Sequence, residues 1–349
     1  MEIRELPVDG YEKVVVAKDP ESKLHALIAV HDTTLGPALG GLRMWPYADQ
    51  DAALTDVLRL AKGMTYKSAI AHTGLGGGKS VIIGDPKSTK SEALYLAMGR
   101  FINSLEGLYI TAEDVNTSIE DLEIVSRETK YVTGLSRESG SSGNPSPYTA
   151  RGCVLGIQKC VERVFDGATV EGKHIVLQGV GAVGSQMARE LHELGARISL
   201  YDMRTDRAEA LARELDAKVL RGEDVISARC DVLAPCALGA VINDDTIPTL
   251  RCKIIAGCAN NQLATRQHGD HLRRRGILYA PDYVINAGGI INVAVELLPG
   301  GYDEAKSLER VQRIPDALEE VFELSEREQI STAEAAHRRA LEILAEGRH

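Results

Sequence analysis

One stretch near the middle of the chain, residues 173–202, constrains the fold more than any other. The apolar run KHIVLQ (173–178) predicts a buried strand, GVGAVG (179–184) follows it directly, and a helical pattern of apolar residues starts inside the glycine run. A second strand pattern, ARISLYD, ends in Asp202. This is the G-x-G-x-x-G fingerprint in a strand–turn–helix context with an acidic residue after the next strand. It predicts a Rossmann domain that binds a dinucleotide.

The fingerprint also predicts how the cofactor is held. Two glycines allow the tight turn and the approach of the pyrophosphate to the helix N-terminus, and the third lets helix and strand pack closely. Asp202 is placed to bond the adenosine ribose hydroxyls, which favours NAD over NADP, although Arg204 and Arg207 follow closely and are compatible with a 2′-phosphate. We expect the cofactor to contact the whole turn: Gly179, Val180, Gly181, Ala182, Val183, Gly184 and Ser185.

The chain beyond this unit continues to alternate strands with helices. Three segments each begin as a buried-type strand and end in small or polar residues: CDVLAPCALGAVI (230–242), CKIIAGCANN (252–261) and GILYAPDYVINAGG (276–289). Ligands of open parallel sheets lie outside the C-terminal strand ends. We therefore expect Asn260, Asn261 and Asn286 near nicotinamide and substrate, with turn formation as the alternative for each. The tail, 303–347, is predicted helical, with one apolar face and a capping box from Ser331 and Glu334.

Length and composition predict two α/β domains with a cleft between them. At 349 residues the chain is long for one core. The Ser-, Gly- and Pro-rich segment 136–147 is the predicted linker. We place a substrate-binding and assembly domain at 1–135, to which the C-terminal helix (about 326–349) returns, and a Rossmann NAD-binding domain at 148–325.

Charge and cysteine usage exclude several classes of function. A net charge of −10 argues against a nucleic-acid surface. No apolar run is long enough to span a membrane, and the N-terminus lacks the apolar core of a signal peptide, so we expect a cytoplasmic protein without a membrane partner. The six cysteines form no C-x-x-C pair and no histidine pair stands at zinc spacing. We expect reduced thiols and no metal site.

A second glycine-rich stretch, residues 64–80 (MTYKSAIAHTGLGGGKS), carries Lys67 and Lys79 on either side of an apolar run. Its local pattern predicts a loop, because glycine admits positive φ and lets a ligand lie against the backbone. A lysine that loses hydration beside another positive charge has a lowered pKa and becomes usable as a base near neutral pH. Two surface lysines beside a turn are the alternative. A phosphate-binding P-loop is excluded, because its first glycine would stand at Thr73.

In the rest of residues 1–135, the sequence pattern predicts strands and helices and one glycine-rich loop. The loop is 31–43, HDTTLGPALGGLR, whose Gly40-Gly41 backbone we expect to face a ligand. The predicted elements are two strands within 13–30, a helix at 50–62, a strand at 79–86, a helix at 91–105 and a strand at 108–114. The last strand delivers Glu113 and Asp114 at its end, where a carboxylate is either a helix N-cap or a catalytic group.

Taken together, these motifs resemble those of the amino-acid dehydrogenase family of glutamate, leucine, valine and phenylalanine dehydrogenases, and those of its leucine dehydrogenase branch most of all. The resemblance covers roughly residues 25–330. It rests on these motifs in one order: GPALGGLRM, KGMTYKSA, GLGGGKSVIIGDP, YITAEDV, SSGNPSP, DVLAPCALG and APDYVINAGG.

The resemblance implies reversible NAD-dependent oxidative deamination of an L-amino acid to its 2-oxo acid and ammonia, with hydride transfer from Cα to nicotinamide. Lys79 matches the catalytic lysine that activates the water attacking the imine. Lys67 matches the lysine that grips the substrate carboxylate, and Asp114 matches the carboxylate that handles the amino group and its proton. Further matching positions assist them: Gly40, Gly41 and Asn261 toward the substrate, and Asn260, Thr149 and Ala237 toward the cofactor.

The resemblance also implies an apolar substrate. The positions that match the side-chain pocket are all apolar: Leu39, Ala112, Ile290 and Val293. No Lys or Ser among them would meet a second carboxylate, which argues against glutamate. One methylene is worth only about 1–3 kcal/mol in such a pocket, so leucine, isoleucine and valine are all expected substrates.

Two positions depart from the leucine branch. Leu42 stands where threonine is usual in the G-G-x-R motif, and Gly184 restores a glycine that many leucine enzymes lack. An aromatic (phenylalanine or tryptophan) dehydrogenase is therefore the alternative activity, and a dinucleotide-binding protein without turnover is the alternative from another class. The family implies a homo-oligomer, from dimer to octamer, built through the first domain.

Overall fold

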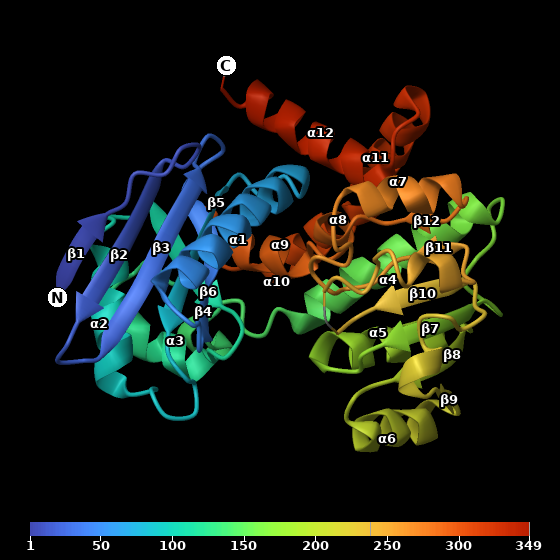
Figure 1. Cartoon of the computed structure of the whole chain (residues 1–349), viewed down its shortest axis with the longest axis horizontal. Helices are drawn as coiled ribbons and strands as arrows, with labels where there is room; N and C mark the ends of the chain where they lie inside the picture. Colours follow the sequence, from blue (N-terminus) through green and yellow to red (C-terminus); the bar gives the residue numbers. More distant parts are fainter. Residues whose placement is uncertain (238, 349) are drawn as a thin grey trace. The chain divides into compact units, whose positions relative to one another are not determined.

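The computed structural model describes residues 1–237 and 239–348, and by its internal packing the chain divides into two units (Figure 1). The first unit comprises Met1–Asn144, Val293–Glu304 and the residues from Ala340 onward, and the second comprises Pro145–Asn292 and Ala305–Arg339. Leu238, inside the motif DVLAPCALG, and His349, in the predicted C-terminal helix, lie outside the described residues. Within the described ranges no helix combines the length and apolarity needed to cross a membrane.

The second unit contains the parallel sheet that the fingerprint predicts. Its order is β9-β8-β7-β10-β11-β12, and every pairing is parallel. This is the doubly wound order 3-2-1-4-5-6, so the Rossmann prediction is confirmed. The strands are β7 (His174–Gln178), β8 (Arg197–Tyr201), β9 (Lys218–Val219), β10 (Val232–Pro235), β11 (Ile254–Ile255) and β12 (Leu278–Tyr279).

Helices pack on both faces of this sheet (Figure 1). Those wholly or largely within the unit are α4 (Ser146–Val164), α5 (Ala182–Glu193), α6 (Thr205–Leu215), α7 (Gln267–Arg274), α8 (Asp282–Ile285), α10 (Glu304–Val311) and α11 (Ile314–Glu328). The helix α12 (Thr332–Glu346) begins in this unit, and its residues from Ala340 onward belong to the first unit. Short 3₁₀ turns lie at Gly222–Asp224 and Ile247–Thr249. The helix α9 (Gly288–Val295) begins in this unit. The apolar face predicted for the tail lies on α11, and its residues are buried: Ile314, Leu318, Val321 and Phe322.

The predicted capping box of α12 is wrong. The Ser331 hydroxyl is buried without a hydrogen-bond partner. The Glu334 carboxylate accepts hydrogen bonds from Arg266 at 3.2 Å and Arg338 at 2.9 Å instead. Arg266, just before α7, and Arg338, one turn along α12, therefore hold the Glu334 carboxylate in place of the predicted capping motif.

The first unit is built on a mixed sheet of order β1-β2-β3-β5-β4-β6. Its strands are β1 (Glu2–Glu5), β2 (Lys13–Asp19), β3 (Leu24–Asp32), β4 (Ala38–Trp45), β5 (Gly76–Ile83) and β6 (Tyr109–Glu113). Strands β1, β2, β3 and β5 pair antiparallel, whereas β5, β4 and β6 pair parallel. The two strands predicted within 13–30 are confirmed as β2 and β3.

Helices cover both faces of this sheet as well. On one face α1 (Gln50–Ile70) packs Ala53, Val57 and Ala61 against the strands. On the other, α2 (Glu92–Asn103) and α3 (Ile119–Ser126) enclose the larger core (Figure 1). A 3₁₀ turn, Arg137–Ser139, follows. The unit is thus a three-layer α/β/α sandwich, and the two-domain α/β fold class is confirmed.

Two glycine-rich stretches predicted as loops are strands. Gly40 and Gly41 lie inside β4, and the glycines before Lys79 begin β5. A Cβ atom on Gly40 would lie 1.7 Å from the Gly78 carbonyl oxygen, and one on Gly77 would lie 2.1 Å from the Thr65 nitrogen of α1. These glycines therefore serve close packing between central strands and helix, not a flexible turn.

The prediction that α1 ends at residue 62 is also wrong. The helix continues to Ile70, so Lys67 stands in its last turn and not in a loop. Gly63 lies inside this helix at an open position, where a Cβ atom would meet nothing within 4 Å.

We predict opposite effects for two glycine-to-alanine substitutions in this unit. Gly40→Ala should destabilise the protein by at least about 3 kcal/mol, because the clashing atoms belong to the backbone of two central strands. Gly63→Ala, at an open helical site, should stabilise it by about 0.5–1 kcal/mol. Urea unfolding of both variants beside the parent chain measures these changes. A Gly40→Ala protein as stable as the parent would show that the two strands do not approach as described.

Candidate active site

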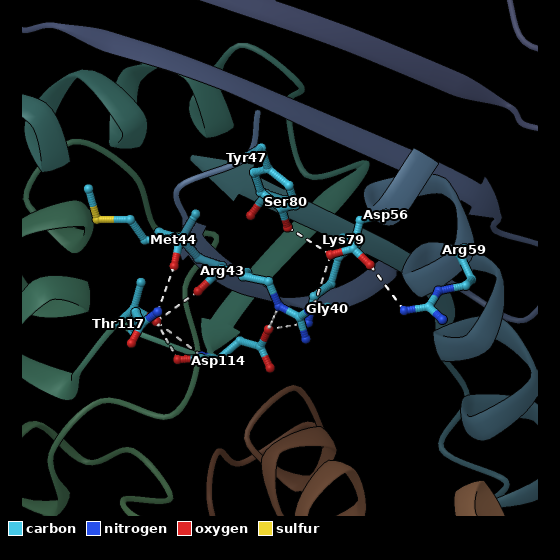
Figure 2. A network of polar contacts seen from close by, with 12 residues as sticks. Gly40, Arg43, Met44, Tyr47, Asp56, Arg59, Lys79, Ser80, Asp114 and Thr117 are labelled. Carbon is cyan, nitrogen blue, oxygen red and sulfur yellow. Dashed lines mark hydrogen bonds and ion pairs between the residues drawn. The ribbon is translucent and has the colours of Figure 1, made fainter. Parts of the chain in front are cut away.

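The ammonium group of Lys79 lies inside the first unit, in the middle of β5. Its side chain is 5% exposed, and its Nζ atom is 2.9 Å from Oδ2 of Asp114, the residue that follows β6 (Figure 2). The expected withdrawal of this lysine from bulk solvent is thus observed, although a strand and not a loop presents it.

Gly41 makes this ion pair possible. It pairs with Ala112 across β4 and β6, and Asp114 stands two residues beyond Ala112, on the same face of the sheet. A Cβ atom on Gly41 would lie 2.6 Å from the Asp114 Cβ and 3.2 Å from the Lys79 Nζ. Any side chain at this position would therefore separate the lysine from the carboxylate.

Asp114 is not a helix N-cap. Ser118 caps α3, in a capping box with Asp121. The Asp114 backbone N–H donates to the Thr117 hydroxyl at 3.0 Å, and that hydroxyl donates to the Leu42 carbonyl at 2.7 Å (Figure 2). The backbone after β6 is thereby fixed to β4, and the carboxylate is left for Lys79 and Arg43.

The pair shifts both pKa values. Burial lowers the pKa of Lys79, because an ammonium group loses its hydration there; the Asp114 charge opposes this effect and the Arg43 charge adds to it. Burial alone would raise the pKa of Asp114, but Lys79 and Arg43 outweigh it and hold that pKa at about 2. Asp114 is therefore ionised at neutral pH, while Lys79 releases its proton more readily than an exposed lysine.

Asp114 has a second cationic partner, Arg43, which was not among the predicted site residues. Arg43 Nε donates to Asp114 Oδ2 at 2.9 Å, and Nη1 of the same guanidinium donates to Asp56 of α1 at 2.9 Å. The Tyr47 hydroxyl donates to Asp56 at 2.7 Å. Arg43 stands two residues after Gly41 in the same motif, whereas nothing local in the α1 sequence marks Asp56.

The other predicted site residues of the first unit lie on the surrounding elements. Lys67 is half-buried on α1, Leu39 is buried on β4 and Ala112 is half-buried on β6. Val293 is buried on α9. The carbonyl of Gly40 accepts a hydrogen bond of 2.6 Å from the buried Tyr109 hydroxyl.

The glycine turn of the second unit has the shape that a dinucleotide needs. Gly179 has a φ of +105°, and a Cβ on it would lie 2.7 Å from the Cβ of Ala237. A Cβ on Gly184 would lie 2.2 Å from the Gly179 carbonyl oxygen, so this glycine serves helix–strand packing. A Cβ on Gly181 would meet nothing within 4 Å, and α5 begins there without a side-chain cap. Open space at an uncapped helix N-terminus fits a pyrophosphate.

Asp202 is oriented by this turn. Its Oδ2 accepts from the Val180 N–H at 2.8 Å and its Oδ1 from the Arg204 N–H at 2.8 Å. The Arg204 guanidinium pairs with Asp206 at 2.9 Å. Of the remaining turn residues, Ser185 donates from its hydroxyl to the Ala182 carbonyl at 3.3 Å, and Val183 lies in the first turn of α5.

The predicted asparagines separate into two groups. Asn286 is buried and donates to Asn260 Oδ1 at 2.7 Å and to the Cys258 carbonyl at 3.1 Å, so these side chains meet beyond β11. Asn261 has a φ of +52°, and its carbonyl accepts from Ala240 N–H at 2.6 Å, as a turn residue does.

The last predicted residues lie on helices of the same unit. The Thr149 hydroxyl donates to the Pro145 carbonyl at 3.2 Å within α4, and Ile290 is buried on α9. Among the described residues, no group of three or more His, Cys, Asp or Glu side chains is arranged to hold a metal ion.

Comparison with known proteins gives the same family along most of the chain. Residues 12–131 match the family described as Glu/Leu/Phe/Val dehydrogenase, dimerisation domain, and residues 198–348 match Glutamate/Leucine/Phenylalanine/Valine dehydrogenase. The leucine dehydrogenase of Thermoactinomyces intermedius is 50% identical over 95% of this chain and 90% of its own. That of Bacillus subtilis (strain 168) is 51% identical over 95% and 91%.

A solved structure agrees with these sequence matches. The crystal structure of L-tryptophan dehydrogenase from Nostoc punctiforme is 42% identical, with a TM-score of 0.84 and 97% of each chain covered. With family matches over both units and relatives at about half identity, the chain belongs to the glutamate, leucine, phenylalanine and valine dehydrogenase family and is an amino-acid dehydrogenase.

Proposed function

We propose that the protein catalyses the reversible NAD-dependent oxidative deamination of an apolar L-amino acid, leucine first, to its 2-oxo acid and ammonia. The observation that carries the proposal is the buried contact between Lys79 Nζ and Asp114 Oδ2 at 2.9 Å. It joins a lysine of lowered pKa to an ionised carboxylate, the two groups that such a reaction needs at its reacting carbon. The identity of about half with the two leucine dehydrogenases supports the choice of leucine.

In this proposal each charged group has one role. Lys67 binds the substrate carboxylate. Asp114 holds the substrate amino group and takes part in moving its proton. Lys79, as the free amine, takes a proton from the water that attacks the imine carbon. A bound nicotinamide would supply the hydride acceptor for Cα. The chain's contribution is to fix the substrate and to keep the amine desolvated.

We propose NAD as the cofactor because of the environment of Asp202. Its two oxygens already accept hydrogen bonds from the backbone of the turn and from Arg204 N–H, which aims the carboxylate at the site of the adenosine ribose. The Arg204 guanidinium pairs with Asp206 in an exposed contact, which is a weak interaction, so the choice of NAD rests on Asp202.

The choice of an aliphatic substrate rests on the apolar positions Leu39, Ala112, Ile290 and Val293. None of them offers a charge or a hydroxyl to a second carboxylate. Leu42, the departure from the leucine branch, is fully buried in the core that α2 and α3 cover. It therefore gives no reason to prefer an aromatic substrate.

We further propose roles for the units and a cellular setting. The first unit, which carries Lys79 and Asp114 and matches a dimerisation domain over residues 12–131, would bind substrate and assemble the homo-oligomer, from dimer to octamer. The second would bind NAD. A cytoplasmic location suits a reaction on free amino acids.

Removal of the Lys79 amine should abolish most of the turnover. Lys79→Ala should lower kcat for leucine by about 10²–10⁴, because general acid–base catalysis is lost. The matched control is Lys87→Ala, an exposed lysine beyond the same strand, which should behave as the parent protein. Both variants should still bind NADH, measured by its fluorescence. A folded Lys79→Ala protein with near-parental kcat would contradict the proposed mechanism.

The substrate assignment predicts a ranking of kcat/KM. Leucine should exceed phenylalanine and tryptophan by at least tenfold, valine and isoleucine should lie within about 10–200-fold of leucine, and glutamate should show no turnover. Initial rates of NADH formation with each amino acid measure the ranking. A higher kcat/KM for phenylalanine or tryptophan would replace the assignment with an aromatic dehydrogenase, and NADH binding without any amino-acid oxidation would remove the enzyme assignment.

A further inference from the structure

The guanidinium of Arg43 joins two carboxylates that come from different layers of the first unit. Its Nε reaches Asp114, beyond β6, and its Nη1 reaches Asp56, on α1, each at 2.9 Å (Figure 2). The Arg43 side chain is only 20% exposed and that of Asp56 is 18% exposed. Such a bridge orders both partners, because a planar guanidinium fixes the directions of its N–H groups.

We propose that Arg43 is a positioning residue for the reaction: held by Asp56 and Tyr47, it keeps the Asp114 carboxylate against Lys79 and shares one Asp114 oxygen with the Lys79 ammonium group. The inference rests on the proposed function of Lys79 and Asp114 and assigns to Arg43, Asp56 and Tyr47 roles that the family resemblance does not supply.

The far end of the bridge is itself fixed. Tyr47 donates to Asp56 Oδ2, the same oxygen that Arg43 contacts. Burial and the Asp56 hydrogen bond raise the pKa of Tyr47, so its hydroxyl stays protonated and stays a donor across the working pH range. Asp56 is thus oriented by a permanent donor, and Arg43 has one defined place to lie.

Two cations share one anion in this cluster. The charged groups that act most strongly on Lys79 are Asp114 after β6, Arg43 on β4 and Asp56 on α1, and the exposed Arg59 contacts the other oxygen of Asp56. Lys79 and Arg43 both contact the same oxygen, Asp114 Oδ2. Arg43 therefore competes with Lys79 for one anion, which weakens the hold of that anion on the Lys79 proton.

This arrangement determines in which direction each substitution shifts the pKa of Lys79. Loss of the Arg43 charge should raise the pKa of Lys79, because a repelling cation disappears and Asp114 is left to Lys79 alone. Loss of the Asp56 charge should lower the pKa of Lys79, because an attracting anion disappears. A substitution that merely loosened the fold would admit water and raise the pKa of Lys79 in both variants.

The test compares Arg43→Gln, Arg43→Lys and Asp56→Asn with the parent enzyme. Arg43→Gln should lower kcat for leucine by about 10–100-fold while KM changes less, because the carboxylate is no longer held in place. Arg43→Lys keeps the positive charge but loses the planar guanidinium that contacts both carboxylates, so its kcat should lie between those of Arg43→Gln and the parent enzyme. The matched control is Arg59→Gln: Arg59 contacts Asp56 at 3.2 Å from the solvent side and is 62% exposed, so the variant should retain parental kcat.

The decisive readout is the pH at which Lys79 titrates. It is measured twice, from the acid limb of kcat/KM and from the pH dependence of Lys79 acetylation by acetic anhydride, quantified by mass spectrometry. Arg43→Gln should move both midpoints up by about half a unit or more, and Asp56→Asn should move them down. Equal midpoints in all variants, or shifts of one sign in both, would overturn the inference.

The acetylation readout separates this inference from the proposed function. If the parent protein oxidises no amino acid but the Lys79 midpoints still move in opposite directions, the proposed function fails and the positioning role of Arg43 stands. If leucine is oxidised and the midpoints do not move, the proposed function stands and the positioning role of Arg43 fails. Thermal unfolding of each variant reports its folding; if Arg43→Gln does not fold, Arg43→Lys and Asp56→Asn decide the matter by the same readouts.

Discussion

A buried ion pair between Lys79 and Asp114 is the interaction on which the site depends. An isolated ammonium group at 5% exposure would lose its proton, and an isolated buried carboxylate would gain one. Placed 2.9 Å apart, each stabilises the charge of the other. Burial and the neighbouring charges together keep the Asp114 carboxylate ionised and lower the pKa of Lys79. That is the state in which one group can hold a cationic substrate and the other can accept a proton.

The sheet around the pair is shaped so that the two groups can meet. Gly41 leaves the space through which Lys79 reaches Asp114, and Gly40 and Gly77 let β4, β5 and α1 approach at backbone distance. The backbone of Lys79 is fixed on both sides, because β5 pairs with β3 and with β4. Asp114 follows the edge strand β6, and the Thr117 hydroxyl ties its backbone to β4. The second unit supplies a different kind of order. There α5 begins without a side-chain cap, and the Asp202 carboxylate is oriented by the Val180 N–H; this is the arrangement to which we assign the cofactor in the proposed function.

Local pattern was sufficient for the dinucleotide-binding turn of the second unit and not for the glycine-rich strands of the first. The fingerprint at 179–184 and Asp202 predicted strand, turn, helix and strand order, because each glycine there acts within a few residues of its neighbours. In the first unit, glycine gave a wrong prediction. Gly40, Gly41 and the glycines before Lys79 predict loops by their local pattern, but in the fold they allow strands and a helix that are distant in sequence to pack closely. The Ser331–Glu334 capping box fails because Arg266 and, one turn along α12, Arg338 hold the Glu334 carboxylate. Arg43 and Asp56 could not be paired from sequence at all, because only the sheet brings α1 and β4 together.

The central claim is that the Lys79–Asp114 pair works directly at the reacting carbon of an amino acid. A crystal structure of the protein with NADH and a non-reactive analogue of the 2-oxo acid of leucine tests it most directly. The account predicts that Lys79 Nζ lies within hydrogen-bond distance of the substituent on C2 of the analogue while it keeps its contact with Asp114. An analogue bound in the occupied site with Lys79 turned away from C2, toward the protein interior or solvent, would contradict it.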